Sequence, residues 1–379
     1  MKKLIYITLV TLLLAACNRD NHQIILRFDG CYASLYLRGD TIHIPEWSFV
    51  AGLKDIVEDK IGALKSIDVK EYTVTLSFEN TVTKIGDETF QGLVSLTSVQ
   101  IPNSVTEIRS YAFQDCTSLT SIEIPNSVTT IGDGAFENCL SLTSIDIPNS
   151  VTTIGDDAFS GCESLTSIEI PNSVTKIGYR AFDDCKSLTS IIIPDSVTEI
   201  GNNAFRGCES LTSIEIPNSV TEIGEAAFAD CTSLTSFSGK FASSDGRCLI
   251  LNGNLLGFAS AGLSEYSIPN SVTEIGGYAF SGCTSLTSID IPNSVTKIGD
   301  DAFRSCESLI SINIPMPVMA IGARAFQYCT SLNSITIPMY VTVIREDAFR
   351  GCDSLASARV PRRFFRDKIF PEHTKVEYY

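Results

Sequence analysis

The chain has 379 residues, of which 44% are hydrophobic, and its 44 acidic and 28 basic side chains give a formal net charge of −16. This apolar content is enough for a folded core and argues against a disordered chain. Binding to nucleic acid depends on neutralising phosphates, so a surface this acidic excludes nucleic acid as an expected partner.

The first 17 residues have the pattern of a targeting segment. Lys2 and Lys3 precede an apolar run, residues 4–14, that is short for a membrane span. The run ends in Leu-Ala-Ala-Cys17, which resembles a bacterial lipobox. This resemblance implies cleavage before Cys17 and lipidation of its sulfur; the alternative is an ordinary secretory peptide with a chance cysteine. We therefore expect an exported protein, lipid-anchored to the outer membrane and displayed at the cell surface.

Residues 18–72 do not follow the repeat that fills the rest of the chain. They contain two strand-like stretches within His22–Asp40, an amphipathic helix over Trp47–Leu64, and the start of a strand-like stretch over Ile67–Phe78. A stacked-repeat protein needs a segment to cover its first coil, so an N-terminal cap is the simplest interpretation. A small ligand-binding module is the alternative.

A 23-residue repeat occupies residues 73–233 and resumes over residues 263–360. Written from its first leucine, the unit reads L-x-x-I-x-I-P-x-S-V-T-x-I-G-x-x-A-F-x-x-C-x-S. The phenylalanine of this unit recurs at Phe90, Phe113, Phe136, Phe159, Phe182, Phe205, Phe228, Phe280, Phe303, Phe326 and Phe349.

The first part of each unit predicts a strand followed by a turn. Ile122 and Ile124 alternate with polar residues, as in a half-buried strand. Pro125 cannot continue a central strand and begins a turn. Val128 and Ile131 are then expected to point back into the core.

The second part predicts a tight bend and a short helix. Gly132 supplies a permissive backbone position. Asp133 is the expected N-cap of a helix that buries Ala135, Phe136 and Cys139. One unit cannot bury its own apolar face, but stacked units can, with parallel strands about 4.8 Å apart.

The repeat resembles the BspA-like class of leucine-rich-repeat proteins, known from bacterial surface lipoproteins. The resemblance covers about residues 73–360 and rests on the IP-x-S-V-T-x-I-G-x-x-AF-x-x-C motif. It implies a curved α/β repeat solenoid with a parallel sheet on one face and short helices or turns on the other, capped at both ends. It also implies binding of proteins, often host or matrix proteins in adhesion. A proline-containing turn stands where many leucine-rich families place an asparagine ladder.

Two segments interrupt or end the repeat. Within residues 234–262, Cys248–Leu251 and Leu255-Leu256 flank Asn252-Gly253, which predicts a hairpin. We expect it to replace the helix of its coil and to protrude, either as a contact loop or as a device that only adjusts curvature. After a final strand that begins at Leu355, residues 361–379 are the expected C-terminal cap.

Catalytic and cofactor chemistry have little support. The three histidines, His22, His43 and His373, all lie outside the repeats. No Ser-His-Asp set, zinc-protease motif, phosphate loop or dinucleotide fingerprint is present. We expect a non-enzymatic protein without a cofactor or a metal.

The repeated cysteines are predicted to be buried free thiols. Equivalent positions on stacked coils lie about 4.8 Å apart, whereas a disulfide needs Cβ atoms about 3.8 Å apart, and no CxxC pair completes a zinc set. Cys31 and Cys248 fall outside this ladder and can pair or remain free. The ladder comprises Cys116, Cys139, Cys162, Cys185, Cys208, Cys231, Cys283, Cys306, Cys329 and Cys352.

Two surface features are candidate partner-binding sites. Each repeat strand has two outward positions, a serine and, two residues later, a residue that is mostly acidic. Like charges on neighbouring strands are costly unless a basic partner or solvent screens them. This acidic stripe comprises Glu123, Asp146, Glu169, Glu215 and Asp290.

The second feature is an apolar patch near the C-terminal end. Where earlier units read Pro-Asn-Ser-Val, two units carry Met316, Met339 and Tyr340 at positions that are polar elsewhere. Exposed apolar clusters suggest a partner site, and methionine adapts to varied partners. The alternative is that these side chains pack against the C-terminal cap.

These features favour a cell-surface leucine-rich-repeat lipoprotein that binds a protein ligand, such as a host or extracellular-matrix protein. The alternative is a glycan-capture or structural envelope lipoprotein. Glycan sites usually need convergent aromatic side chains, but the chain has one tryptophan, Trp47, and no aromatic residue at the outward strand positions. Its membrane contact is expected through the N-terminal lipid alone.

Overall fold

The computed structural model describes residues 23–28, 33–37, 40–44, 57–70, 73–78, 80–365 and 367–379. The predicted signal segment and Cys17 lie outside these residues, as does Cys31. Most of the helix predicted over Trp47–Leu64 also lies outside them; within its described part, residues 57–60 are helical.

Antiparallel strands precede the first coil. Strand β1 (Gln23–Phe28) pairs with β5 (Thr73–Phe78) on one side and with β7 (Leu96–Gln100) on the other, and β4 (Leu64–Lys70) extends the sheet beyond β5. Strands β2 (Ala33–Leu37) and β3 (Asp40–Ile44) form a separate hairpin. The edge of the first repeat strand is therefore covered by β1.

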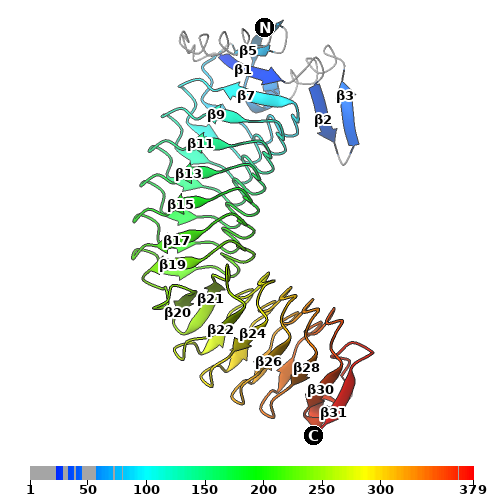
Figure 1. Ribbon diagram of the computed structural model, residues 1–379. Helices are drawn as coiled ribbons and strands as arrows, with labels where there is room; N and C mark the ends of the chain where they lie inside the picture. Colours follow the sequence, from blue (N-terminus) through cyan, green and yellow to red (C-terminus); the bar gives the residue numbers. More distant parts are fainter. Residues whose placement is uncertain are drawn as a thin grey trace, which may run out of the picture.

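The repeats form a parallel β-solenoid of about twelve turns of about 23 residues, as the sequence predicts (Figure 1). Each regular coil contributes one strand to each of two parallel sheets. The first sheet is made by β7, β9 (Ser121–Glu123), β11 (Ser144–Asp146), β13 (Ser167–Glu169) and β15 (Ser190–Ile192), followed by the pair β17 (Ser213–Ile216) and β19 (Ser236–Gly239). The second sheet is made by β6 (Lys84–Ile85), β8 (Glu107–Ile108), β10 (Thr130–Ile131), β12 (Thr153–Ile154), β14 (Lys176–Ile177), β16 (Glu199–Ile200) and β18 (Glu222–Ile223).

The same arrangement resumes in the C-terminal half. The first sheet there ends in a last parallel strand, β31 (Lys375–Tyr378), and a 3₁₀ turn, η2 (Arg362–Phe364), precedes this strand in the chain. Its other strands are β22 (Glu265–Ser267), β24 (Ser288–Asp290), β26 (Ser311–Asn313), β28 (Ser334–Thr336) and β30 (Ser357–Val360). The second sheet comprises β20 (Cys248–Leu251), β21 (Asn254–Phe258), β23 (Glu274–Ile275), β25 (Lys297–Ile298), β27 (Ala320–Ile321) and β29 (Val343–Ile344).

The third side of each coil consists of turns, so the predicted short helix and its cap are wrong. Gly134 and Asn138 have φ angles of 57°, and a left-handed residue cannot continue a right-handed helix. The Phe136 amide donates instead to the Ala158 carbonyl of the next coil, at 2.9 Å. Asp133 Oδ1 accepts from the amide of Asp156, also in the next coil, at 2.9 Å. The Phe136 amide and the Asp133 carboxylate therefore each form a hydrogen bond to the next coil, and neither acts within a helix.

A ladder of stacked phenylalanines fills the core. Phe113 and Phe136 are fully buried, and their ring centroids lie 5.4 Å apart with the planes at 3°. The prediction for the ten repeat cysteines is confirmed, because all are buried and free. The Cys139 thiol donates to the Phe113 carbonyl at 3.3 Å, and equivalent contacts recur along the ladder. Cys248 is also buried and free.

The predicted hairpin is confirmed, but its expected position is wrong. Asn252 and Gly253 have φ angles of 52° and 80°, as the favoured two-residue hairpin turn requires, and β20 pairs antiparallel with β21. The hairpin does not protrude, because β21 joins the second sheet beside β23 and Leu249 and Leu255 are fully buried. Leu249 belongs to the core of the N-terminal half and Leu255 to a separate core in the C-terminal half. The array changes direction at this point (Figure 1).

Candidate functional site

The structure brings three of the predicted acidic residues together. Asp146 lies in register between Glu123 and Glu169 on adjacent strands, and all three side chains are exposed. Ile192, 75% exposed, follows Glu169 in the next strand and separates it from Glu215. The acidic stripe is therefore continuous over three coils.

Asp290 lies apart from this group. It stands beyond the hairpin, in register with Ser267 on one side and Asn313 on the other. Because neither neighbour is charged, Asp290 does not extend the stripe.

The predicted apolar patch is exposed on two adjacent coils. Met316, Met339 and Tyr340 are 51%, 52% and 60% exposed. More than half of each side chain is therefore accessible beside the described part of the C-terminal cap.

Sequence reasoning missed other members of this patch. Met319, Val343 and Phe365 are also substantially exposed. Phe365 lies 23 residues after Thr342 and 46 after Met319, so it continues the same turn position onto the cap coil. The signal was available, because Val360-Pro361 aligns with the Ile-Pro of each unit. We define the C-terminal patch as Met316, Met319, Met339, Tyr340, Val343 and Phe365.

These apolar residues replace groups that bond the coils together. In six of the described coils the serine of the Pro-x-Ser-Val turn donates to a carbonyl of the preceding coil; Ser127 Oγ, for example, donates to Val105 O at 2.5 Å. Pro317 and Tyr340 occupy this serine position and lack its short hydroxymethyl group. A hydrogen bond within a protein contributes about 1 kcal/mol, so these two coils forgo local stability.

In the next coil, arginines occupy the positions that Met339 and Tyr340 have in the patch. Arg362 and Arg363 lie 23 residues after Met339 and Tyr340, and both are exposed. Arg363 Nη2 donates to the Met339 carbonyl at 2.8 Å, which fixes it beside the patch. The three proline turns at residues 315–319, 338–342 and 361–365 contain no carboxylate.

A shallow groove of about 480 Å³ runs along the second sheet, from Ile223 and Glu225 at the end of the N-terminal half into the C-terminal half. The repeated glycines line it together with Glu274 and Lys297. At its far end are Val343 and Arg345, and Arg345 takes the place of the repeat glycine. Arg345 Nη1 reaches Asp300 Oδ2 at 3.4 Å. No aromatic residue lines the groove.

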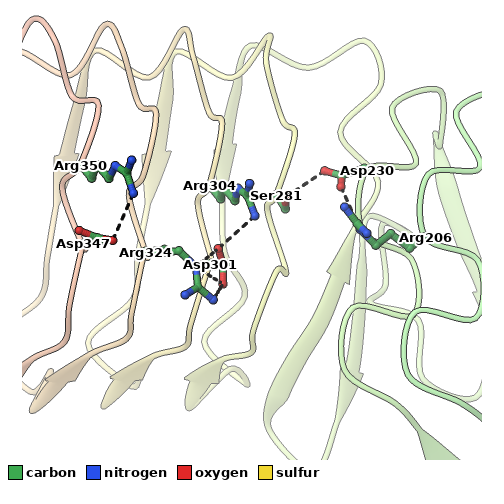
Figure 2. A network of polar contacts seen from close by, with 8 residues as sticks. All are labelled: Arg206, Asp230, Ser281, Asp301, Arg304, Arg324, Asp347 and Arg350. Atoms are coloured by element: carbon green, nitrogen blue, oxygen red, sulfur yellow. Dashed lines mark hydrogen bonds and ion pairs between the residues drawn. The ribbon is translucent and has the colours of Figure 1, made fainter. Parts of the chain in front are cut away.

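Polar contacts on the turn side hold the coils together (Figure 2). Asp301 is fully buried, and Arg324 donates to both its oxygens, with Nη2 at 2.8 Å from Oδ2. The Asp301 carboxylate raises the pKa of Arg324. At the junction between the halves, Ser281 Oγ donates to Asp230 Oδ1 at 2.9 Å, and Arg206 pairs with the other oxygen (Figure 2). A buried charge needs such partners, so we assign this network to stability.

The buried thiols are poor nucleophiles. Burial raises the pKa of Cys162 and of Cys231 to about 12, and the thiolate is the reactive form. Among the described residues, no group of three or more His, Cys, Asp or Glu side chains is placed to hold a metal. In the same part of the chain, no helix has the length and apolar character to span a bilayer.

Comparisons with solved structures find proteins similar to most of this chain. A leucine rich cell surface protein from Faecalibacterium prausnitzii A2-165 is 31% identical, with 93% of this chain and 94% of that chain covered and a TM-score of 0.64. A leucine-rich repeat protein from Bacteroides ovatus is 32% identical over 84% of this chain and 91% of that chain, with a TM-score of 0.45. The pneumococcal vaccine antigen PcpA shares 18% identity over 93% of both chains, with a TM-score of 0.50.

No curated protein matches the chain. The model of the BspA type leucine rich repeat region, by contrast, matches residues 70–185, 152–243 and 257–377. These matches cover well over half of the sequence and coincide with the coils described above. The chain therefore belongs to the BspA-type leucine-rich-repeat family.

Proposed function

We propose that this chain is an exported cell-surface protein that binds another protein, with a host or matrix protein as the expected class of ligand. The relative from Faecalibacterium prausnitzii is a cell surface protein, which supports surface display here. The lipobox-like sequence before Cys17 supports a lipid anchor in the outer membrane. Binding, and not catalysis, is the activity that this scaffold would perform.

The observation that carries the proposal is the C-terminal patch. Five of its six exposed apolar side chains stand at turn positions where most other coils place asparagine, serine or threonine, and the sixth, Val343, stands where most other coils place lysine, glutamate or threonine. Apolar clusters of this kind mark interaction sites on soluble proteins. The serine hydrogen bonds missing from the same coils add weight, because stability is commonly forgone at functional positions.

The acidic stripe is a second proposed contact surface, for a basic protein segment. Glu123, Asp146 and Glu169 place three carboxylates in register, and a basic partner would relieve their mutual repulsion. Changing these three residues to glutamine would then weaken binding of a basic ligand. An unchanged affinity would remove the stripe from the proposal.

Glycan capture is the less favoured alternative. Sugar sites usually combine aromatic faces with polar groups, but the groove has no aromatic lining. Tyr340 and Phe365 are exposed on different coils among methionines. This composition fits a protein surface better.

The test is a binding screen of the purified chain, without its signal segment, against matrix proteins and glycans. A triple variant with Met316→Asn, Met339→Asn and Tyr340→Ser restores the repeat residues at these three positions and should fold. We expect it to lose binding to the protein ligand by at least about tenfold, equal to about 1.4 kcal/mol. The matched control is Leu140→Ser with Tyr179→Ser, which removes partly exposed apolar side chains far from the patch. Binding to glycans alone would contradict the proposal.

The anchor is tested separately. Cys17→Ser should abolish labelling of the protein by a radioactive fatty acid and move it out of the membrane fraction. Continued membrane association of this variant would contradict lipidation at Cys17.

A further inference from the structure

The C-terminal patch differs from the rest of the molecule in charge as well as in polarity. The whole chain carries a formal charge of −16, yet the three proline turns that hold every patch residue except Val343 have two arginines and no carboxylate. Arg362 continues the position of Met316 and Met339, and Arg363 continues that of Tyr340. Apolar side chains therefore lie beside positive charge on an acidic protein.

The geometry at this corner keeps both kinds of group accessible. Phe365 is 66% exposed and contacts Tyr378 edge-on, with ring centroids 5.1 Å apart. Arg363 is held by its bond to the Met339 carbonyl, and Arg362 is exposed. The patch is thus a fixed apolar surface with guanidinium groups along one edge.

We propose that the C-terminal patch binds a protein segment that carries both acidic and large apolar side chains. This inference rests on the proposed function and names the chemistry of its partner. Guanidinium groups pair with carboxylates with good geometry, while methionine side chains adapt to the shape of apolar partners. Complementary charge would set the orientation and the association rate, and the apolar contacts would supply most of the affinity.

A membrane surface is a different candidate that the observations favour less. Anionic lipid attracts basic segments, but the net charge of −16 opposes approach of this protein to such a surface. Strand β31, beside the patch, also lies at the opposite end of the array from β1, which follows the predicted anchor (Figure 1). The patch therefore lies at the end of the array opposite β1.

The test uses a random peptide library displayed on phage and selected on the purified chain without its signal segment. We expect the selected peptides to be enriched in Asp and Glu together with Leu, Phe or Trp. The binding constant of the strongest peptide is then measured on a consensus-restoring variant that combines Met316→Asn, Met319→Thr, Met339→Asn and Tyr340→Ser. We expect a loss of at least about tenfold, the effect of one interface anchor. Circular dichroism melting checks that the variant is folded.

The charge component has its own variants. Arg362→Gln should lower the affinity for the selected peptide by about threefold or more and reduce the salt dependence of binding. The matched control Lys65→Gln removes one exposed positive charge at the other end of the array and should change neither.

Several results would overturn the inference. They are selected peptides without acidic enrichment, an affinity unchanged by the consensus-restoring variant, or binding to phosphatidylglycerol vesicles in place of peptides. Self-association that the consensus-restoring variant abolishes, seen by light scattering, would assign the patch to a second copy and also overturn it. Acidic peptides or matrix proteins that bind elsewhere would leave the proposed function standing while this inference fails. If no protein or peptide binds, both fail.

Discussion

Replacing one phenylalanine of the ladder tests how the core is built. Phe159 is fully buried, and its ring centroid lies 5.5 Å from Phe136 and 5.6 Å from Phe182. Phe→Ala changes in a core cost about 3–5 kcal/mol, and each aromatic pair adds about 0.5–1.5 kcal/mol beyond area burial. Because the Phe159 ring stacks on a neighbour at each side, Phe159→Ala should fall in the upper part of this range.

The division of the core predicts where the effect appears. The two hydrophobic cores meet at the hairpin, and stacked repeats couple mainly to their neighbours. We expect two unfolding transitions, one for each core. Phe159→Ala should lower the melting temperature of the N-terminal half only. The matched variant Phe326→Ala, in the other core and 5.2 Å from both ring neighbours, should lower the other.

The assay is differential scanning calorimetry combined with hydrogen exchange measured by mass spectrometry. At about 2–4 °C per kcal/mol for units of this size, a cost of about 4–5 kcal/mol lowers the melting temperature of the affected half by roughly 8–20 °C. Ile192→Ser, at an exposed position, should leave both transitions in place. A single transition lowered equally by both phenylalanine variants would refute the division, and a cost below about 1 kcal/mol would refute the ladder as the core.

Three further predictions follow from the polar groups. Tyr340→Ser should raise the stability of the C-terminal half by about 1 kcal/mol, because the new serine can form the bond to the preceding coil that Ser127 forms with the Val105 carbonyl. A lower melting temperature would contradict this. Burial, and then the nearby charge of Asp157, raises the pKa of Glu137 above its ordinary value of 4.5. Glu137 therefore destabilises the fold increasingly as pH rises from its ordinary pKa to its raised pKa, and the cost persists above that. Glu137→Gln should accordingly stabilise the protein at neutral pH and lose this advantage below pH ~4, as followed by urea denaturation. Iodoacetamide should not modify Cys162 in the native protein at mildly alkaline pH, because burial raises its pKa to about 12; mass spectrometry showing rapid native-state labelling would count against a closed core.

The sequence predicts the periodic part of the fold well. Ile122, Val128 and Phe136 recur every 23 residues, and a residue that recurs at this spacing must occupy the same place on each coil. Their burial and the register of the strands follow from that repetition. The cysteine ladder was predictable for the same reason.

Local backbone conformation was harder to predict. The AF-x-x-C segment has helix-compatible residues, but Asn138 and the residue before Ala135 adopt positive φ, and only the neighbouring coil supplies the partner for the Phe136 amide. Tertiary hydrogen bonds thus override local propensity. The predicted position of the hairpin was wrong for a similar reason. The turn depends on local residues, whereas the burial of the hairpin depends on the coils on either side.

The candidate surfaces were predictable where the repeat itself provides a reference. Met316, Met339 and Tyr340 are noticeable because the consensus at their positions is polar. Phe365 was missed because its coil departs from the consensus around it, although Val360-Pro361 already aligns Phe365 with Met319. The burial of Phe364 at the valine position agrees with this alignment. The interruption of the acidic stripe by Ile192 was readable from the repeat and was overlooked.

The central claim, that the C-terminal patch binds a protein partner, is tested most directly by one affinity comparison. The tightest protein ligand from the binding screen is titrated against the wild-type chain and against the consensus-restoring variant, whose fold is checked by calorimetry. We predict a rise in the dissociation constant of at least about tenfold, with both unfolding transitions retained. An equal dissociation constant for the two folded proteins would contradict the claim.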